Sequence, residues 1–390
     1  MKHSETTGEQ EGPMPHLPDE VLEPILVDAV QGMTLVEALR LAHLGPRLMY
    51  LARPAIFRDT TIPAYHGGRA FQFSELPFGA ESGLRPLVRQ LRFNGRVSLS
   101  HRALPSDAVV NPEDVIHFCA KFPRLESVRL EALSCHIPFR FYIAAPTFPA
   151  LNTVRTLSID LNETTSAVDA LVCFLPSATH VDDLTIRVTK EVDIPFCTLL
   201  SDPLMTKTLK ASTLHLGHCT LDKTPLINRC LASSGPNVRC LTIDLAPVYA
   251  DQYEEAPALH IDLGRNSEMR ELIATVPFAP REWSGEAEAS TRPLMRMLGT
   301  TPSTLERLVI VILSRPRNYV DLCGALTFFL LADIISTTTQ RAPNLRTIEM
   351  SLDIDRAPDQ GPAIEDIWQE AFRRMPGWHV PNARLDVRFT

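Results

Sequence analysis

The sequence has no long uncharged apolar run. The longest, residues 322–332, ends at Asp333 and is far shorter than the ~18 to 20 residues that a membrane-spanning helix needs, so it predicts a buried helix. Residues 1–13 are polar and acidic and lack the apolar core of a secretory leader. We therefore expect a protein of the cytoplasm or nucleus with no membrane partner.

A concentrated positive charge is also lacking. The chain has 38 Lys plus Arg against 46 Asp plus Glu, a net charge of -8, and no basic run along the sequence. This is the wrong sign for affinity gained by neutralising nucleic-acid phosphates. Aromatic residues, at 7%, are too few for a platform on which single-stranded bases stack. No nucleic-acid partner is expected.

The eight cysteines form no C-x-x-C pair, and a chain of 390 residues needs no disulfides to hold its core. They are interpreted as buried, reduced thiols. His215, His218 and Cys219 lie close together in sequence, but no second pair with zinc-ligand spacing accompanies them. No metal site is predicted.

Motifs that carry catalysis are missing as well. There is no G-x-S-x-G nucleophile elbow, and no glycine-rich phosphate turn follows any expected strand. Residues 353–359 are similar to a calcium loop, but Pro358 and Ile364 stand where glycine and a bidentate acid are required. The sequence therefore predicts no catalytic residues and no cofactor, and we expect a protein that is not an enzyme.

What the sequence does contain is a degenerate repeat. The pattern apolar-x-x-apolar-x-apolar recurs nine times, with 27 to 40 residues between successive units. Its last two apolar positions alternate with polar or small residues, which is typical of a strand with one buried face. The central apolar residues of the nine units are Leu91, Val128, Leu157, Leu184, Leu214, Leu241, Leu272, Leu308 and Ile348.

Between the expected strands lie segments with helical spacing, namely residues 112–122, 166–175, 225–232 and 321–338. The 32 prolines, against only 17 glycines, often fall shortly before a strand, where they end the preceding helix. Strand and helix therefore alternate from about residue 87 to residue 390.

These units resemble the irregular leucine-rich repeats of fungal and plant proteins, and Cys219 occupies the asparagine-ladder position that the family allows. The resemblance implies an α/β solenoid of parallel strands and helices. An ordinary doubly wound α/β domain would also alternate strands with helices and stays open as an alternative.

Residues 15–62 break the repeat and are expected to form a small module that is helical throughout. Their opening run, Leu-Pro-x-Glu-Val-Leu-x-x-Ile-Leu, resembles the F-box signature, although the later Lys and Trp of that family are absent. We expect a disordered tail over residues 1–14 and a linker over 63–86. The resemblance assigns adaptor binding to Leu17, Pro18, Glu20, Val21, Leu22, Ile25 and Leu26.

The combined resemblance implies the substrate-recognition subunit of a Skp-cullin-F-box ubiquitin ligase. The F-box would bind the Skp-type adaptor and its cullin complex, and the repeats would hold a target protein. The alternative is a leucine-rich-repeat scaffold without a ligase, in which the first helices only cap the solenoid.

The strands of a solenoid line its concave face, so the residues between the buried positions form the default recognition surface. Ile273, Val309 and Val311 would form an apolar patch there, unless those strands are covered on both faces. The loops at 250–257 and 280–293 are either solvated excursions or part of the binding side. The target-binding residues predicted in this way are Arg92, Arg129, Thr185, His215, Thr242, Ile273, Val309, Val311 and Glu349.

Overall fold

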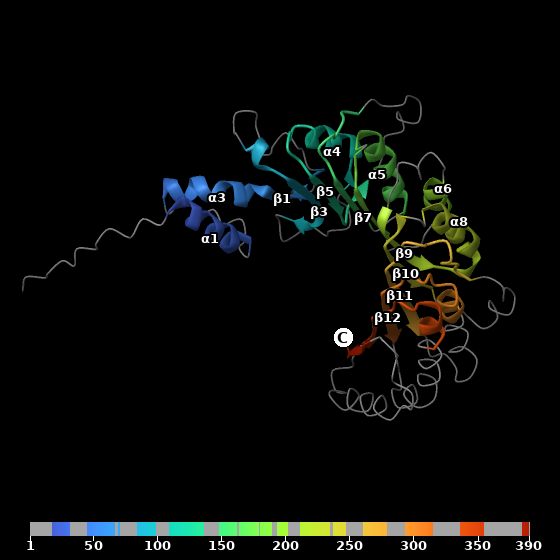
Figure 1. Cartoon of the computed structure of the whole chain (residues 1–390). Helices are drawn as coiled ribbons and strands as arrows, with labels where there is room; N and C mark the ends of the chain where they lie inside the picture. The colour runs from blue at the N-terminus through green and yellow to red at the C-terminus, as the bar shows by residue number, and fades with distance from the viewer. Residues whose placement is uncertain are drawn as a thin grey trace, which may run out of the picture.

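The computed structural model places eleven parallel strands and one short antiparallel strand in a single curved sheet (Figure 1). It describes residues 18–31, 45–66, 69–70, 84–98, 109–135, 148–161, 164–178, 180–188, 193–201, 211–234, 237–246, 260–278, 293–314, 336–354 and 384–389. Expectations for the remaining residues, among them the loops at 250–257 and 280–292 and the segment 322–332, lie outside the described residues.

The sheet is built strictly in chain order. From β1 through β3 to β14 each strand of the sheet pairs in parallel with the sheet strand that follows it in the chain, and the short β2 lies outside this order, antiparallel on the free edge of β1. A doubly wound domain has a point at which the strand order reverses, so that alternative is excluded. The strands are β1 (Asp59–His66), β2 (Arg69–Ala70), β3 (Gln90–Ser98), β5 (Ser127–Glu131), β7 (Thr156–Leu161), β8 (Asp183–Val188), β9 (Ala211–Cys219), β10 (Cys240–Leu245), β11 (Glu271–Phe278), β12 (Arg307–Ser314), β13 (Thr347–Ile354) and β14 (Arg384–Phe389).

All nine repeat units fall on strands of this sheet, β3 to β13, as the apolar pattern predicted. The sequence did not predict β1 and β14, which extend the sheet at its two ends. Smaller elements complete the fold: the two-stranded pair β4 (Val109–Val110) and β6 (Ser134–Cys135), and the 3-10 turns η3 (Arg85–Leu87) and η6 (Leu221–Lys223).

Helices cover the outer side of the curve, and the strands line its inner side (Figure 1). They are α4 (Pro112–Cys119), α5 (Thr164–Ser177), α6 (Ile194–Ser201) and α8 (Thr224–Ser234). Three of these helices confirm expected segments. In α4, the Asn111 side chain accepts a hydrogen bond from the Glu113 amide at 3.1 Å, and Pro112 opens the first turn, as helix starts favour.

One continuous core fills the space between sheet and helices. Where the structure describes them, the apolar strand residues of the repeat units that face the helices are buried, as Leu241 and Ile243 are in β10, both with no exposed surface. The core extends without a break from Ile62 in β1 to Ile348 in β13. Because each unit buries its apolar face against its neighbours, the units are stable only as a stack.

A recurring turn leads from the outer side into the strands. The amide of Leu125 donates to the carbonyl of Phe122 at 3.3 Å, and corresponding bonds precede β7, β11, β12 and β13. Pro123 occupies the second position of its turn, where its fixed φ is already suitable. Pro302 and Pro343 also belong to turns of this kind, before β12 and β13, whereas Pro176 lies within α5.

Polar side chains fasten neighbouring units to one another. Asn228 of α8 donates to the carbonyl of His260 at 2.9 Å and accepts from the amide of Asp262 at 2.8 Å. Thr300 Oγ1 accepts from the Leu263 amide at 2.9 Å in the next unit. These bonds pair backbone groups that would otherwise lack partners near the sheet.

The register changes between β8 and β9, which corrects the predicted recognition row. Leu184 pairs with Ala211 but Thr185 pairs with Thr213, so Ser212 is left over as a bulge. His215 consequently lies beside Arg187, and Thr185 is not its neighbour. The predicted row of target-binding residues is thus broken in two at this point, because β8 and β9 pair two residues away from the alignment of their apolar triplets, with Ile186 and not Leu184 beside Leu214.

At the other end, α1 (Asp19–Gln31) and α3 (Pro46–Arg58) pack against each other. The expectation that residues 15–62 are helical throughout is wrong at its end, since β1 begins at Asp59 and belongs to the sheet. The segment 32–44, expected to hold a further helix, lies outside the described residues. Figure 1 shows α1 and α3 extending from the end of the sheet at β1.

Candidate binding surfaces

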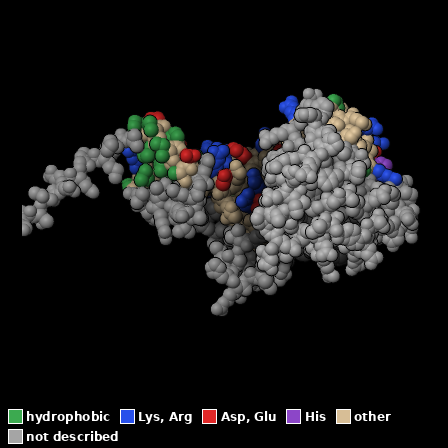
Figure 2. Space-filling model, turned by 90° about the horizontal axis from the view of Figure 1, so that it is seen from below, with side chains coloured by type: hydrophobic (Ala, Val, Ile, Leu, Met, Phe, Trp, Pro, Cys, Tyr) green, Lys and Arg blue, Asp and Glu red, His purple; other side chains and the backbone are tan. Residues whose placement is uncertain are grey.

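The α1–α3 pair presents apolar side chains to solvent. Val21 and Ile25, one turn apart on α1, are 47% and 53% exposed, and Tyr50 of α3 is 76% exposed. Pro18 at the start of α1 is exposed as well. These four residues are called the apolar end surface below. Figure 2 shows hydrophobic side chains gathered at this end of the molecule.

The predicted adaptor-binding residues divide into three groups. Pro18, Glu20, Val21 and Ile25 are exposed, whereas Leu22 is half-buried and Leu26 is only 5% exposed. Leu26 therefore belongs to the core of the helix pair and is not available at its surface. Leu17 lies outside the described residues.

Sequence reasoning missed Tyr50. In α3 the buried residues are Leu51, Ala52 and Ile56, which lie on one face of the helix. A tyrosine directly before Leu51 points away from that face, so helical spacing would have identified it as an exposed aromatic residue.

The helix pair has its own small core. Leu26, Leu51, Ala52 and Ile56 are buried, yet none of them is part of the core cluster of the sheet, which begins at Ile62. Asp19 of α1 and Arg47 of α3 form an ion pair across the two helices, with Arg47 Nε 2.8 Å from Asp19 Oδ1. Among the described side chains of the helix pair, Phe57 at the end of α3 packs against the sheet core.

The second candidate surface is the inner face of the sheet, defined by the strand residues that point away from the helices. Its ladder rows follow the pairing of the strands. One row contains Arg92, Arg129, Ser158, Thr185, Thr213, Cys240, Glu271, Arg307 and Thr347. The next contains Asn94, Glu131, Asp160, Arg187, His215, Thr242, Ile273, Val309 and Glu349.

Ion pairs cross the strands on this face. Arg92 Nε is 3.0 Å from Glu131 Oε1, and Arg187 approaches Asp160 at 3.8 Å. Figure 2 shows acidic and basic side chains interleaved on the part of the sheet that is visible beside α3. In the described part of the chain Arg129 has no such partner, so it is a cation available to a ligand on the inner face.

Arg307 joins three strands. Its guanidinium holds both carboxylate oxygens of Glu349 on β13, at 3.0 and 2.9 Å, and also pairs with Glu271 on β11. The hydrogen bonds to Glu349 raise the pKa of Arg307 above its usual value. Glu349, which was predicted as a target-binding residue, is thus already engaged within the sheet.

His215 and Asp244 form a pair near the middle of the inner face. His215 Nε2 lies 2.7 Å from Asp244 Oδ2, and Asp244 also has a hydrogen bond to Thr275. Burial alone would raise the pKa of Asp244, but the hydrogen bonds from His215 and Thr275 outweigh it and lower that pKa. Among the described residues, this pair belongs to no group of three His, Cys, Asp or Glu side chains that could hold a metal ion.

The expected apolar patch is only partly accessible. The side chain of Val309 is only 9% exposed, whereas Ile273 and Val311 are half-buried. Leu313, two residues further along β12, is 38% exposed. Apolar contact on this face therefore depends on Ile273, Val311 and Leu313 more than on Val309.

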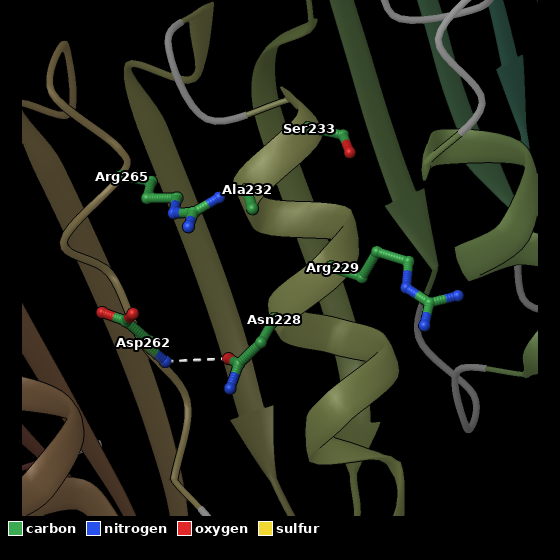
Figure 3. A pocket seen from close by; sticks show the side chains of 6 residues that line it. All are labelled: Asn228, Arg229, Ala232, Ser233, Asp262 and Arg265. Carbon is green, nitrogen blue, oxygen red and sulfur yellow. Dashed lines mark hydrogen bonds between the residues drawn. The ribbon is translucent and has the colours of Figure 1, made fainter.

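A hollow of about 400 Å³ lies between α8 and the segment that leads to β11. Figure 3 shows the hydrogen bond from the Asp262 amide to Asn228 across it, and Arg265 and Arg229 extending in different directions. Because the two guanidinium groups do not converge, they form no clamp for an anion. The residues that line the hollow are Asn228, Arg229, Ala232, Ser233, Asp262 and Arg265.

The described cysteines are free thiols, and all but Cys240 are buried. Burial raises the pKa of Cys197 to about 11 and that of Cys173 to about 12, so both stay protonated at neutral pH. Among the described residues, no three His, Cys, Asp or Glu side chains come together as metal ligands. His215, His218 and Cys219 accordingly form no such group.

No protein-family model matches the sequence, and a search of curated proteins finds no relative. In the described ranges, no helix combines the length and the apolar character that crossing a membrane requires. The two candidate surfaces must therefore be interpreted from their own residues.

Proposed function

We propose that the protein is the substrate-recognition subunit of a Skp-cullin-F-box ubiquitin ligase. In this proposal the α1–α3 pair is the F-box, which binds a Skp-type adaptor through the apolar end surface. The sheet is an irregular leucine-rich-repeat solenoid that holds a target protein on its inner face. The protein catalyses nothing itself and raises the effective concentration of target lysines near the ubiquitin-loading enzyme.

The observation that carries the proposal is the separation of the α1–α3 core from the sheet core. A helix pair that served only to cap the solenoid would bury its apolar residues against the first strand. Here Leu26, Leu51 and Ile56 are buried apart from that core, while Val21 and Ile25 face solvent. An apolar surface on a separate small module is typical of a site for a partner protein.

The inner face supports the second half of the proposal. It is lined by polar and charged side chains in regular rows, with Arg129 and Arg92 at one end and Ile273 and Leu313 toward the other. A surface that combines apolar positions with ordered charges can select a protein partner by complementarity. The target-binding residues remain a proposal of this kind.

The experiment is co-expression of the full chain with a fungal Skp-type adaptor, followed by size-exclusion chromatography. We expect stoichiometric co-elution, and its loss in Val21→Asp/Ile25→Asp. The matched control is Val172→Asp/Ile194→Asp, because these aliphatic residues on α5 and α6 are 42% and 60% exposed and lie on the outer side. Both variants should keep the circular-dichroism spectrum of the wild type.

Two results would contradict the proposal. If the wild-type chain elutes alone while folded, α1 and α3 are not a functional F-box, and the protein is better described as a binding scaffold without a ligase. If Val172→Asp/Ile194→Asp abolishes co-elution as effectively as Val21→Asp/Ile25→Asp, the adaptor does not recognise the apolar end surface.

A further inference from the structure

A row of charged residues runs along the edge of the sheet at which the strands begin. Each member directly precedes its strand or falls at its start, and for most members the backbone carbonyl accepts hydrogen bonds from the next strand of the sheet. Arg239, for example, accepts from the amides of Arg270 and Glu271 at 2.8 and 3.0 Å. In spatial order the row is Arg58, Arg89, Glu126, Arg155, Asp182, Ser212, Arg239, Arg270, Glu306 and Arg346.

This row is basic although the chain is acidic. It contains six arginines against three carboxylates, in a protein whose net charge is -8. The sequence shows no basic run because each repeat unit contributes at most one of these arginines. Stacking the units at about 4.8 Å per strand gathers them on one edge.

Cross-strand ion pairs account for part of the row. Arg89 lies 2.8 Å from Glu126, Arg155 lies 3.8 Å from Asp182, and Arg270 lies 3.6 Å from Glu306. Such pairs between neighbouring strands stabilise a sheet and fix its register. In the first half of the row, from Arg89 to Asp182, the charges alternate and are balanced.

In the second half of the row the charges do not alternate. Arg239 and Arg270 are direct neighbours of like charge, which destabilises a sheet. Arg239 and Arg346 are exposed, and in the described part of the chain neither side chain has an ion-pair or hydrogen-bond partner. Arg270 keeps 64% of its side chain exposed. Positions that break a local rule without compensation are where function is expected.

We propose that Arg239, Arg270 and Arg346 form an interaction site for an acidic, extended peptide segment of a partner protein. This basic edge segment is distinct from both the inner face and the apolar end surface. Its three guanidinium groups span three strand-to-strand steps, about 15 Å, which an extended peptide covers with about five residues. Carboxylate side chains can meet each guanidinium with paired hydrogen bonds.

The charge pattern favours a peptide over a nucleic acid. Glu306 stands in the row between Arg270 and Arg346. A peptide can place an uncharged residue opposite Glu306, whereas a phosphodiester backbone carries a charge at every step. The net charge of -8 further opposes binding of a long polyanion.

The test measures binding of a fluorescein-labelled eight-residue peptide of alternating glutamate and serine to the full chain by fluorescence polarisation at low ionic strength. We expect saturable binding that weakens as salt is added. It should weaken at least tenfold in Arg239→Glu/Arg346→Glu. The control Arg53→Glu/Arg229→Glu changes the net charge equally at two exposed arginines outside the row and should bind as the wild type does.

A thermal-unfolding scan separates this role from a structural one. Glu at position 239 faces Arg270 as an opposite charge, so the Tm of Arg239→Glu should equal or exceed that of the wild type, although the peptide affinity falls. A lowered Tm would mean that Arg239 stabilises the sheet and would overturn the proposal. Arg239→Gln/Arg346→Gln repeats the binding test if the charge-reversed protein fails to fold.

Three binding results would also overturn it: no binding of the peptide to the wild type, equal binding by the wild type and Arg239→Glu/Arg346→Glu, or tighter binding of a single-stranded oligonucleotide with the same number of charges. None of these results depends on the adaptor. The proposal of a ligase function and the proposal of a peptide site at the basic edge segment can therefore be refuted independently.

Discussion

Gly95 of β3 lies very close to the backbone that follows β5, and its replacement by alanine tests the stacking of the first units. An added Cβ would overlap with the carbonyl oxygen of Ala132. It would also lie 2.9 Å from the carbonyl carbon of Ala132 and 3.1 Å from Leu133 Cδ2. Real Cβ atoms essentially never approach a neighbour below 3.0 Å, so the backbone after β5 must move by roughly 1 Å.

That movement is resisted on both sides. The amide of Ala132 donates to the carbonyl of Asp160 in the next unit at 2.8 Å, and Leu133 is buried with 2% exposure. Overpacking alone costs about 1–3 kcal/mol, and a lost hydrogen bond adds about 1 kcal/mol. We expect Gly95→Ala to lower the free energy of unfolding by about 3–4 kcal/mol, which for a chain of 390 residues is a fall in Tm of roughly 4–5 °C.

The assay is urea denaturation and thermal unfolding followed by circular dichroism. Gly45→Ala is the matched control, because a Cβ at Gly45 meets nothing within 4 Å and φ is an extended 172°. It should change stability by less than about 0.5 kcal/mol. Ala132 has a φ of 51°, so Ala132→Gly should restore part of the stability lost in Gly95→Ala by letting this segment adapt. A loss below about 1 kcal/mol in Gly95→Ala would refute the placement of β3 against β5.

Three further outcomes follow from the described contacts. Asn228→Ala removes two hydrogen bonds to the neighbouring unit and should cost about 1–3 kcal/mol in urea denaturation, with Asn228→Asp worse because a carboxylate cannot donate to the His260 carbonyl. The lowered pKa of Asp244 stabilises the protein above the ordinary Asp pKa, and this contribution is lost as pH falls through the lowered value. The stability difference between wild type and Asp244→Asn should therefore be largest near neutral pH and shrink in acid, as denaturation at a series of pH values can show. Because burial raises their pKa, Cys197 and Cys173 should resist iodoacetamide at pH 8 until the chain is denatured, as intact-protein mass spectrometry can show.

Much of the sheet could be predicted because every unit repeats the same local pattern. The alternation of buried and exposed residues placed Leu91 and Leu308 correctly in strands of one sheet, and the helical spacing located α4, α5 and α8. These features depend on residues close in sequence. The terminal strands β1 and β14 were missed because neither was among the nine units of the apolar pattern.

The register across strands could not be predicted in the same way. Aligning the apolar triplets sets Thr185 beside His215, but β8 and β9 pair two residues away from that alignment, with a bulge at Ser212, and Arg187 lies there instead. A bulge depends on backbone pairing between two strands, and the pattern within a single strand carries no signal for it. The sequence likewise gave no sign that Glu349 would be held by Arg307, 42 residues away.

The same limit explains why the apolar end surface could largely be predicted from the sequence, whereas the inner face and the basic edge segment could not. The apolar end surface lies on one helix and its neighbour, so most of its residues could be read from spacing along α1. The inner face and the basic edge segment exist only after many units stack, since neighbouring members such as Arg239 and Arg270 come from successive strands. The net negative charge argues against a long polyanion as partner. It cannot show where the stacked units gather their arginines on one edge of the sheet. Surfaces of this kind in repeat proteins have to be sought row by row in the folded structure.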